Sequence, residues 1–332
     1  MKTNWDVIVI GAGMAGLSAA QQLRAAGKDV LVLEKSRGVG GRMATRRTDA
    51  GQWDHGAQYF TARSATFRRQ IALWLRANVV SRWHEPIYAW DGTTLQASSP
   101  QQRFVGKPTM NAPLRAMAAQ LVIELSAQVS CISRSCGAWS VHSESKTWQA
   151  PELVLAIPAP QVARLLPATH PLQAATAQVT MQPCWAVMIS SKHAIHLPFA
   201  GLFVNETNVN DDVLSWIALD SSKAGRSGQH WVLHASVAWS LAHLDDTPDM
   251  VIDALCQAFS RLLKQWGQSK PSWQAATAHR WLYARGNAEA PITQDASDGL
   301  AIAGDWLAGG RVEGAYLSGV AAADILLTHS AN

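Results

Sequence analysis

This 332-residue sequence has no long apolar segment, few charged residues and only four cysteines. Charge or proline interrupts every apolar run before the roughly 20 residues that a membrane helix requires, so we expect no membrane span. The cysteines form no C-x-x-C pair, which is typical of free thiols in a reducing compartment. A strand-like run already begins at Val7, leaving no room for a signal peptide, and we therefore expect a cytoplasmic protein.

Common catalytic and binding patterns are missing as well. No G-x-S-x-G motif indicates a serine hydrolase, and the pairs His193/His196 and His230/His234 lack a cysteine or carboxylate at metal-ligand spacing, so no metal is expected. Basic residues outnumber acidic ones in residues 1–82, although the net charge is only +4. Without a nucleic-acid-binding motif, this segment indicates a solvated face or the attraction of an anionic ligand, and no nucleic acid is expected as a partner.

What remains is a globular composition with one strong pattern at its start. Residues 7–10 are four consecutive apolar residues, which predict a strand buried on both faces of a parallel sheet. A helical spacing of apolar residues follows until Gly27, and residues 30–33 predict a second buried strand ending on Glu34. This strand–helix–strand order is typical of a dinucleotide-binding unit.

Three glycines in the spacing G-x-G-x-x-G join the first strand to the helix. Gly11 permits a tight turn, Gly13 lets the backbone approach a pyrophosphate, and Gly16 allows the helix to pack closely on the strand. The helix N-terminus offers free N–H groups to the phosphates. About twenty residues on, Glu34 can accept hydrogen bonds from ribose hydroxyls.

Two further segments extend this pattern. Gly40-Gly41-Arg42 follows the second strand and suits a pyrophosphate enclosed from a second side, with Arg42 as a charged donor. Near the other end, residues 299–304 predict a buried strand ending on Asp305, and residues 312–323 predict a helix rich in small residues. The two signatures, almost three hundred residues apart, predict one discontinuous ligand-binding domain.

These motifs resemble the FAD-binding signatures of the flavin amine oxidase superfamily, and Gly56-Ala57-Gln58-Tyr59 resembles the renalase branch, including the bacterial renalases. The resemblance implies FAD as the cofactor. No cysteine lies near Gly304–Gly319, so we expect FAD to be bound without a covalent link. With the reasoning above, it implies the following FAD-binding residues: Gly11, Ala12, Gly13, Met14, Ala15, Gly16, Glu34, Lys35, Gly41, Arg42, Gly56, Ala57, Gln58, Tyr59, Val129, Gly304, Asp305, Val312, Glu313, Gly314 and Ala315.

The resemblance also implies the architecture. We expect an α/β fold (α+β overall) with a discontinuous, Rossmann-like FAD-binding domain of the p-hydroxybenzoate hydroxylase-like type and a second, mixed-sheet substrate domain. The FAD-binding domain is predicted to comprise residues 1–62, 103–160 and 277–332, and the substrate domain residues 63–102 and 161–276. Within the latter, strands are expected near residues 184–190, 213–219 and 230–239, and a helix from Pro248.

One residue directs the prediction of the reaction. Arg311 precedes Val312-Glu313, where monoamine oxidases carry an aromatic residue, and arginine is a poor neighbour for an ammonium ion but a good one for phosphate or carboxamide oxygen. A dihydronicotinamide that gives up a hydride has no proton to lose, so it needs orientation more than an acid or base. No catalytic residue is assigned. The candidates on the substrate side are Arg311, Tyr283, Trp281 and Gln58.

The resemblance to renalases implies an oxidase of 2- and 6-dihydro-NAD(P) isomers that passes electrons to O2 and produces hydrogen peroxide. Two alternatives remain open. One is a flavin amine oxidase or desaturase acting on a small or apolar substrate. The other is a flavin-binding redox sensor, or a protein that binds a partner without turnover.

Overall fold

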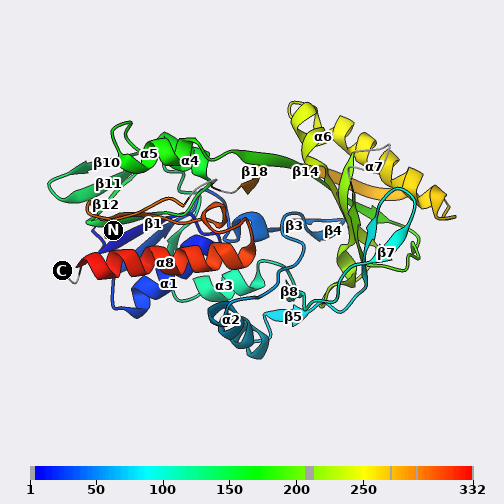
Figure 1. The fold of residues 1–332 in the computed structure, drawn as a ribbon, viewed down its shortest axis with the longest axis horizontal. Coiled ribbons are helices and arrows are strands. Elements are labelled where there is room, and N and C mark those ends of the chain that lie inside the picture. Colours follow the sequence, from blue (N-terminus) through cyan, green and yellow to red (C-terminus); the bar gives the residue numbers. More distant parts are fainter. Residues whose placement is uncertain (1–3, 206–212, 270, 287, 289–290, 331–332) are drawn as a thin grey trace.

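A parallel sheet of five strands forms one end of the molecule, in the order β19-β13-β1-β2-β9 (Figure 1). The computed structural model describes residues 4–205, 213–269, 271–286, 288 and 291–330. Every residue of strands β1, β2, β13 and β19 is buried, as their apolar runs predict. The strands are β1 (Val7–Ile10), β2 (Val30–Leu33), β9 (Val122–Glu124), β13 (Glu152–Leu155) and β19 (Leu300–Ile302).

The two faces of this sheet have different covers. Successive side chains of a strand point to opposite faces, so Val7 and Val9 pack with helices α1 and α8, whereas Ile8 and Ile10 pack against an antiparallel sheet, β10-β11-β12. The covering elements are α1 (Met14–Ala25), α3 (Ala112–Ala118), β10 (Cys131–Ser135), β11 (Ala138–His142), β12 (Thr147–Ala150), α4 (Ala159–Leu165), α5 (Pro171–Ala177) and α8 (Val312–Ser330).

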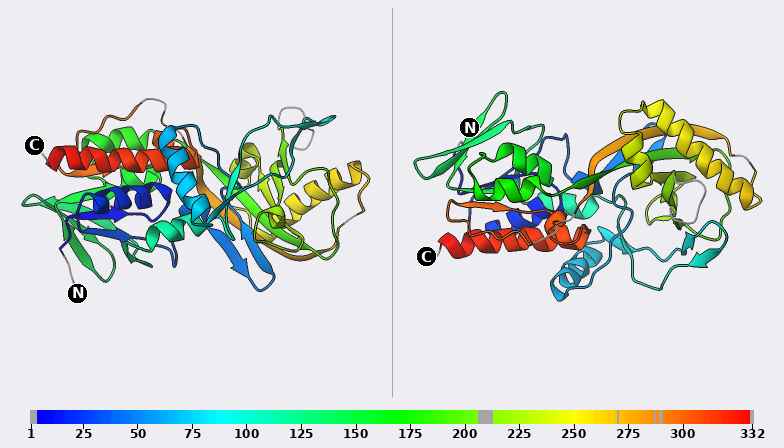
Figure 2. Two further views of the ribbon diagram at one scale, coloured as in Figure 1. Left: turned by 90° about the horizontal axis from the view of Figure 1, so that it is seen from below. Right: turned by 45° about the horizontal axis from the view of Figure 1, so that its top comes forward.

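A mixed sheet of seven strands forms the other end, in the order β18-β14-β17-β16-β15-β6-β7. Figures 1 and 2 show its two long strands, β14 and β18, running toward the parallel sheet, and helix α7 covering its outer face. The elements are β6 (Ile87–Trp90), β7 (Leu95–Ala97), β14 (Met181–Ser191), β15 (Gly201–Val204), β16 (Leu214–Leu219), β17 (His230–Ala235), α6 (Val237–Ala242), α7 (Pro248–Gln265) and β18 (Trp273–Gly286).

Short segments join the two sheets. Trp53, on the hairpin β3-β4, packs against Met188 and Val232 of the seven-stranded sheet, while Phe67 and Trp74 of α2 contact Tyr316 of α8. The connecting elements are the 3₁₀ turn Gly41–Met43, β3 (Thr45–Thr48), β4 (Gly51–Asp54), α2 (Ala65–Arg76), β5 (Val80–Arg82), β8 (Phe104–Gly106) and the 3₁₀ turns Asp220–Ser222 and Asp305–Leu307.

The predicted fold class is confirmed: a parallel sheet assembled from distant segments lies beside a mixed sheet. The strand expected over residues 230–239 is wrong at its end, because the Ser236 side chain accepts a hydrogen bond from the Trp239 N–H and starts helix α6. The helix from Pro248 is confirmed, with Thr247 as its N-cap. The domain boundaries stay a prediction. Within the described residues, no helix is long and apolar enough to cross a membrane.

Candidate functional site

The turn between β1 and α1, residues 11–16, has the backbone that its glycines predict. Gly11 has φ +106°, and a Cβ there would lie 2.5 Å from the carbonyl oxygen of Ala156. A Cβ at Gly16 would overlap the carbonyl oxygen of Gly11, so this helix can approach the strand only with glycine. Gly13 has open space on its Cβ side and caps α1 without a side-chain hydrogen bond, which leaves the start of the helix available to a ligand.

Glu34 holds this turn from the end of β2. Its side chain is buried, with Oε2 accepting a hydrogen bond from Ala12 N at 2.8 Å and Oε1 accepting one from Ser36 N at 2.8 Å. A carboxylate has about four lone-pair positions, so capacity remains for two hydroxyl donors. The Ala127 N–H donates to the Glu34 carbonyl, and Val129 lies two residues further along the chain. This places the segment around Val129 at the same edge of the sheet as Glu34. Lys35 is exposed.

The second glycine segment lies against the first. A Cβ at Gly41, which has φ +52°, would be 3.3 Å from Gly13 Cα. The Arg42 guanidinium binds the Asp305 carboxylate with both terminal nitrogens, at 3.0 and 2.5 Å, and donates to the Ala284 carbonyl at 3.1 Å. The two charged residues that sequence analysis assigned to one ligand are therefore paired with each other in this structure.

The start of α8 lies close to the start of α2. Glu313 is buried, and its carboxylate accepts hydrogen bonds from Arg63 N at 3.0 Å and from Ser64 N at 2.6 Å. Its carboxylate thus holds the entry to α2. The first N–H groups of α8 belong to Val312, Glu313 and Gly314, whereas the Ala315 N–H donates to the Arg311 carbonyl at 2.9 Å. Arg311 lies immediately before the helix and is exposed.

A third segment, residues 54–59, meets the Arg42 loop. Ala57 N donates to the Arg42 carbonyl at 2.9 Å, and a Cβ at Gly56 would overlap that same carbonyl oxygen. The Trp281 indole donates from Nε1 to the His55 carbonyl at 3.0 Å and stacks on the His55 ring at 4.9 Å. The structure thus brings one of the four substrate-side candidates, Trp281, onto this segment, which contains Gln58 itself. Tyr283 instead pairs with Arg164 of α4.

Three imidazoles lie together beside this segment. The ring of His55 lies 4.8 Å from that of His279, and His234 Nε2 contacts the His55 carbonyl at 3.2 Å. Burial, with smaller contributions from His279 and Arg46, lowers the pKa of His55 to about 3. Burial likewise lowers the pKa of His234 and of His279 to about 4 each. All three are therefore neutral at pH 7.

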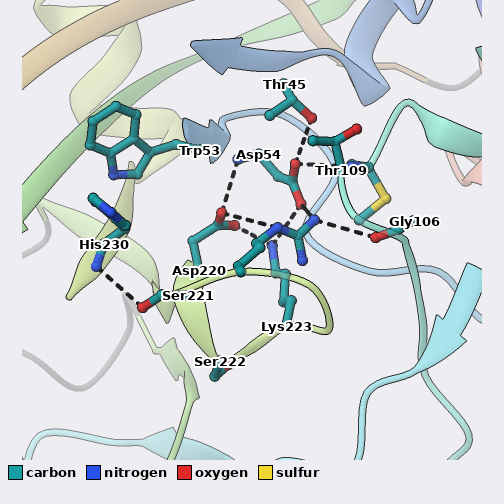
Figure 3. Close-up of polar contacts among 12 residues, drawn as sticks. Thr45, Trp53, Asp54, Gly106, Thr109, Asp220, Ser221, Ser222, Lys223 and His230 are labelled. Atoms are coloured by element: carbon teal, nitrogen blue, oxygen red, sulfur yellow. Dashed lines mark hydrogen bonds and ion pairs between the residues drawn. The ribbon is translucent and has the colours of Figure 1, made fainter. Parts of the chain in front are cut away.

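Sequence analysis missed a group of charges beneath the seven-stranded sheet, here called the buried charge cluster. It consists of Asp54, Asp220 and Lys223, which are labelled in Figure 3, and Arg226. All four side chains are at most 1% exposed. Lys223 Nζ lies 2.5 Å from Asp220 Oδ1 and 3.4 Å from Asp54 Oδ2, and Arg226 pairs with Asp54. In sequence, D-x-x-K-x-x-R between two strands is typical of an exposed loop, so no signal marked it.

The cluster reaches the 54–59 segment through Gln58. Lys223 Nζ donates to Gln58 Oε1 at 3.3 Å, and Gln58 Nε2 donates to the carbonyl oxygens of Asp54 and Gly56. The Gln58 amide is thus bound to its own segment and to Lys223. Burial raises the pKa of Asp220 despite Lys223, whereas burial of Asp54 is outweighed by Lys223 and Arg226, which lower its pKa.

No group of three or more histidine, cysteine, aspartate or glutamate side chains suited to a metal ion occurs among the described residues. The described residues thus form a glycine-lined turn at the carboxyl ends of parallel strands and a polar segment that faces the second sheet. This is the position in which open α/β sheets bind nucleotide ligands.

Comparisons with known proteins agree with this geometry. Residues 88–327 match the family described as flavin containing amine oxidoreductase, and residues 9–71 match the NAD(P)-binding Rossmann-like domain. The fold is similar to that of cyclohexylamine oxidase from Brevibacterium oxydans IH-35A, at 14% identity and a TM-score of 0.77 over 99% of this chain and 100% of that one. It is also similar to a redesigned putrescine oxidase, at 13% identity and a TM-score of 0.70 over 98% and 99% of the two chains.

A short stretch of the chain is similar to curated L-amino-acid oxidases. An L-amino-acid oxidase of Demansia vestigiata is 55% identical over 47 residues, which is 14% of this chain and 9% of that oxidase. The chain thus matches about a tenth of the length of such relatives.

Proposed function

The chain belongs to the family of flavin containing amine oxidoreductases, and from this premise we propose that it is an FAD-dependent oxidoreductase that oxidises dihydronicotinamide dinucleotides. The proposed donors are the 2- and 6-dihydro isomers of NAD(P), as in renalases. When bound, FAD supplies the hydride acceptor and passes the electrons to O2, so that one dihydro-NAD(P), one O2 and one proton give NAD(P)+ and hydrogen peroxide.

The glycine turn suits the FAD phosphates and ribose. The open side of Gly13 and the uncapped start of α1 would accept the pyrophosphate, and the remaining lone pairs of Glu34 would accept ribose hydroxyls. Arg42, fixed by Asp305, would place a positive charge beside the phosphates without moving. The start of α8 would direct its N–H groups and positive dipole end toward negative charge on the flavin ring.

The observation that carries the choice of substrate is the charge around the 54–59 segment. Its buried carboxylates, Asp54 and Asp220, are already paired with Lys223 and Arg226, and its three imidazoles are neutral. An ammonium substrate would find no free carboxylate among these groups, and its oxidation would require a base, for which imidazoles with pKa values of about 3 to 4 are weak. A dihydronicotinamide needs neither. The residues of this chain would then act by orienting the substrate and excluding water.

A flavin amine oxidase is the second candidate function. It is favoured by the names of similar proteins, which include cyclohexylamine oxidase and L-amino-acid oxidase. Those names describe the other proteins, whose identity to this chain is low or confined to a short stretch.

Anaerobic mixing separates the candidates. The FAD-loaded protein is mixed with a preparation of dihydro-NAD isomers or with a panel of amines, and the flavin absorbance is followed. Rapid bleaching by the isomers and none by the amines is expected. Bleaching by the amines alone would contradict the proposal, and bleaching by neither would favour a sensor.

In a second test, Arg311→Tyr should slow turnover of the isomers more than it weakens FAD retention.

A further inference from the structure

Three aromatic rings and an arginine lie together next to Gln58, and they are here called the aromatic–arginine cluster: Tyr59, Trp83, Arg103 and Trp216. The Tyr59 ring centroid lies 6.1 Å from that of Trp83 and 5.9 Å from that of Trp216. Arg103 Cζ lies 5.5 Å from the Tyr59 ring centroid. The cluster joins the 54–59 segment to strand β16 of the seven-stranded sheet.

The charge of Arg103 is buried, and no described residue provides a counter-charge. Arg103 is 7% exposed, and Lys223 nearby is 1% exposed. Lys223 pairs with two carboxylates, whereas Arg103 has no ion pair with any described residue and donates only to Ser98 Oγ at 2.7 Å. Burying an unpaired cation costs free energy, which cation–π contact with Tyr59 offsets in part.

The cluster also has spare donors. Arg103 Nε and Trp216 Nε1 are both buried, and neither has a hydrogen-bond partner among the described residues. Lys223 Nζ lies 5.7 Å from the Trp83 ring centroid, but Asp220 and Asp54 balance its charge. The described polar groups that are left unused here are therefore N–H donors, beside the positive charge of Arg103 and between flat apolar rings. A ligand that matches them must carry acceptor oxygens and negative charge.

The cluster is not sealed from solvent. Tyr59 is half-buried, and Phe203, whose ring centroid lies 4.7 Å from that of Trp216, is 37% exposed. Lys223 also contacts Gln58 at 3.3 Å, so the cluster borders the segment that we propose faces FAD. A ligand could therefore extend from that segment toward the surface along the rings.

We propose that the aromatic–arginine cluster binds an anionic group of the substrate, with Arg103 as the residue that recognises its oxygens. This inference rests on the proposed function, in which the anion is the pyrophosphate of the dinucleotide. The charge of Arg103 would repel an ammonium group, so the cluster would also select against amines.

The test measures binding to the oxidised, FAD-loaded protein, with NAD+ and inorganic pyrophosphate as separate probes. Tryptophan fluorescence and the flavin spectrum report binding. Arg103→Gln should weaken both probes at least tenfold, and Arg103→Lys should recover part of the loss. Arg280→Gln is the matched control, because Arg280 also lies over a ring, with its Cζ 5.8 Å from the Trp185 centroid, but has Asp245 as a partner. It should bind both probes as the wild type does.

A thermal melt of the same variants separates recognition from a structural role. Because Arg103 is unpaired, Arg103→Gln should leave the unfolding temperature unchanged or raise it while binding falls. Wild-type binding by Arg103→Gln, or tighter binding of benzylamine than of pyrophosphate, would overturn the inference. If dihydro-NAD isomers fail to bleach the flavin but pyrophosphate binding still depends on Arg103, the proposed function falls and the anion site stands. If the isomers bleach the flavin but binding is independent of Arg103, the anion site falls and the proposed function stands.

Discussion

The glycine turn of the parallel sheet consists mainly of backbone, whereas the buried charge cluster under the seven-stranded sheet consists of charged side chains. The first is made of backbone: Gly11 and Gly16 allow close packing, Gly13 leaves space for a ligand, and Glu34 is the side chain that holds the turn. The second is made of ionised side chains without access to solvent. A backbone site tolerates little change of shape, whereas a side-chain cluster tolerates little change of charge. Substitutions should therefore fail in different ways at the two places.

Removing one charge from the cluster should have the largest effect. Lys223→Met keeps the length of the side chain but leaves Asp220 buried without its nearest cation, which should cost about 3–5 kcal/mol of unfolding free energy. Urea unfolding measures the loss. Lys146→Met is the control, since Lys146 pairs with Glu124 at the surface, and it should cost less than about 1 kcal/mol. Equal losses in the two variants would show that burial of the pair does not matter.

Acid should destabilise the region around the cluster before it affects the glycine turn. His55 is protonated near pH 6.5 when unfolded but only near pH 3 when folded. Because the unfolded chain binds the extra proton, this stability is present above pH 6.5 and is lost as the pH falls, with the loss reaching about 3 kcal/mol by pH 4. Urea midpoints measured between pH 7 and pH 4 give the slope. His55→Gln should reduce the slope to the part that His234 and His279 contribute, and an unchanged slope would refute the assignment.

The glycine turn should be sensitive to added side-chain volume, even where the charge does not change. Gly16→Ala places a methyl group against the Gly11 carbonyl and should destabilise the protein by about 2 kcal/mol, even though alanine favours helices. Gly13→Ala is the matched variant, because its methyl group meets nothing in the structure. It should leave the stability of the FAD-free protein unchanged and weaken FAD retention. If both glycines behave alike, the distinction between packing and ligand approach is wrong.

The difference between the two regions also explains what the sequence could predict. A turn that only glycine can adopt leaves its spacing in the sequence, so Gly11–Gly16, the strands around it and Glu34 could be located without coordinates. The family resemblance predicts Gly56 and Asp305 as FAD-binding residues. No sequence pattern marks Asp220, Lys223 or Arg103. Their burial results from the seven-stranded sheet folding over the 54–59 segment. Charged residues between strands otherwise indicate a solvated loop.

The smallest expected effect tests whether Glu34 differs from an ordinary acid at a strand end. Glu34 ends β2 against the glycine turn, and Glu124 ends β9 beside it but binds Lys146 and Trp148 instead. Glu34→Gln keeps a hydrogen-bond acceptor and loses the charge, so FAD affinity should fall by about 1 kcal/mol, roughly fivefold. Glu124→Gln should leave it unchanged. Cofactor loss on dilution measures both. A matching loss in the two variants would mean that any negative charge at this edge of the sheet serves equally well, and that the hydrogen bond from Ala12 N to Glu34 holds only the turn.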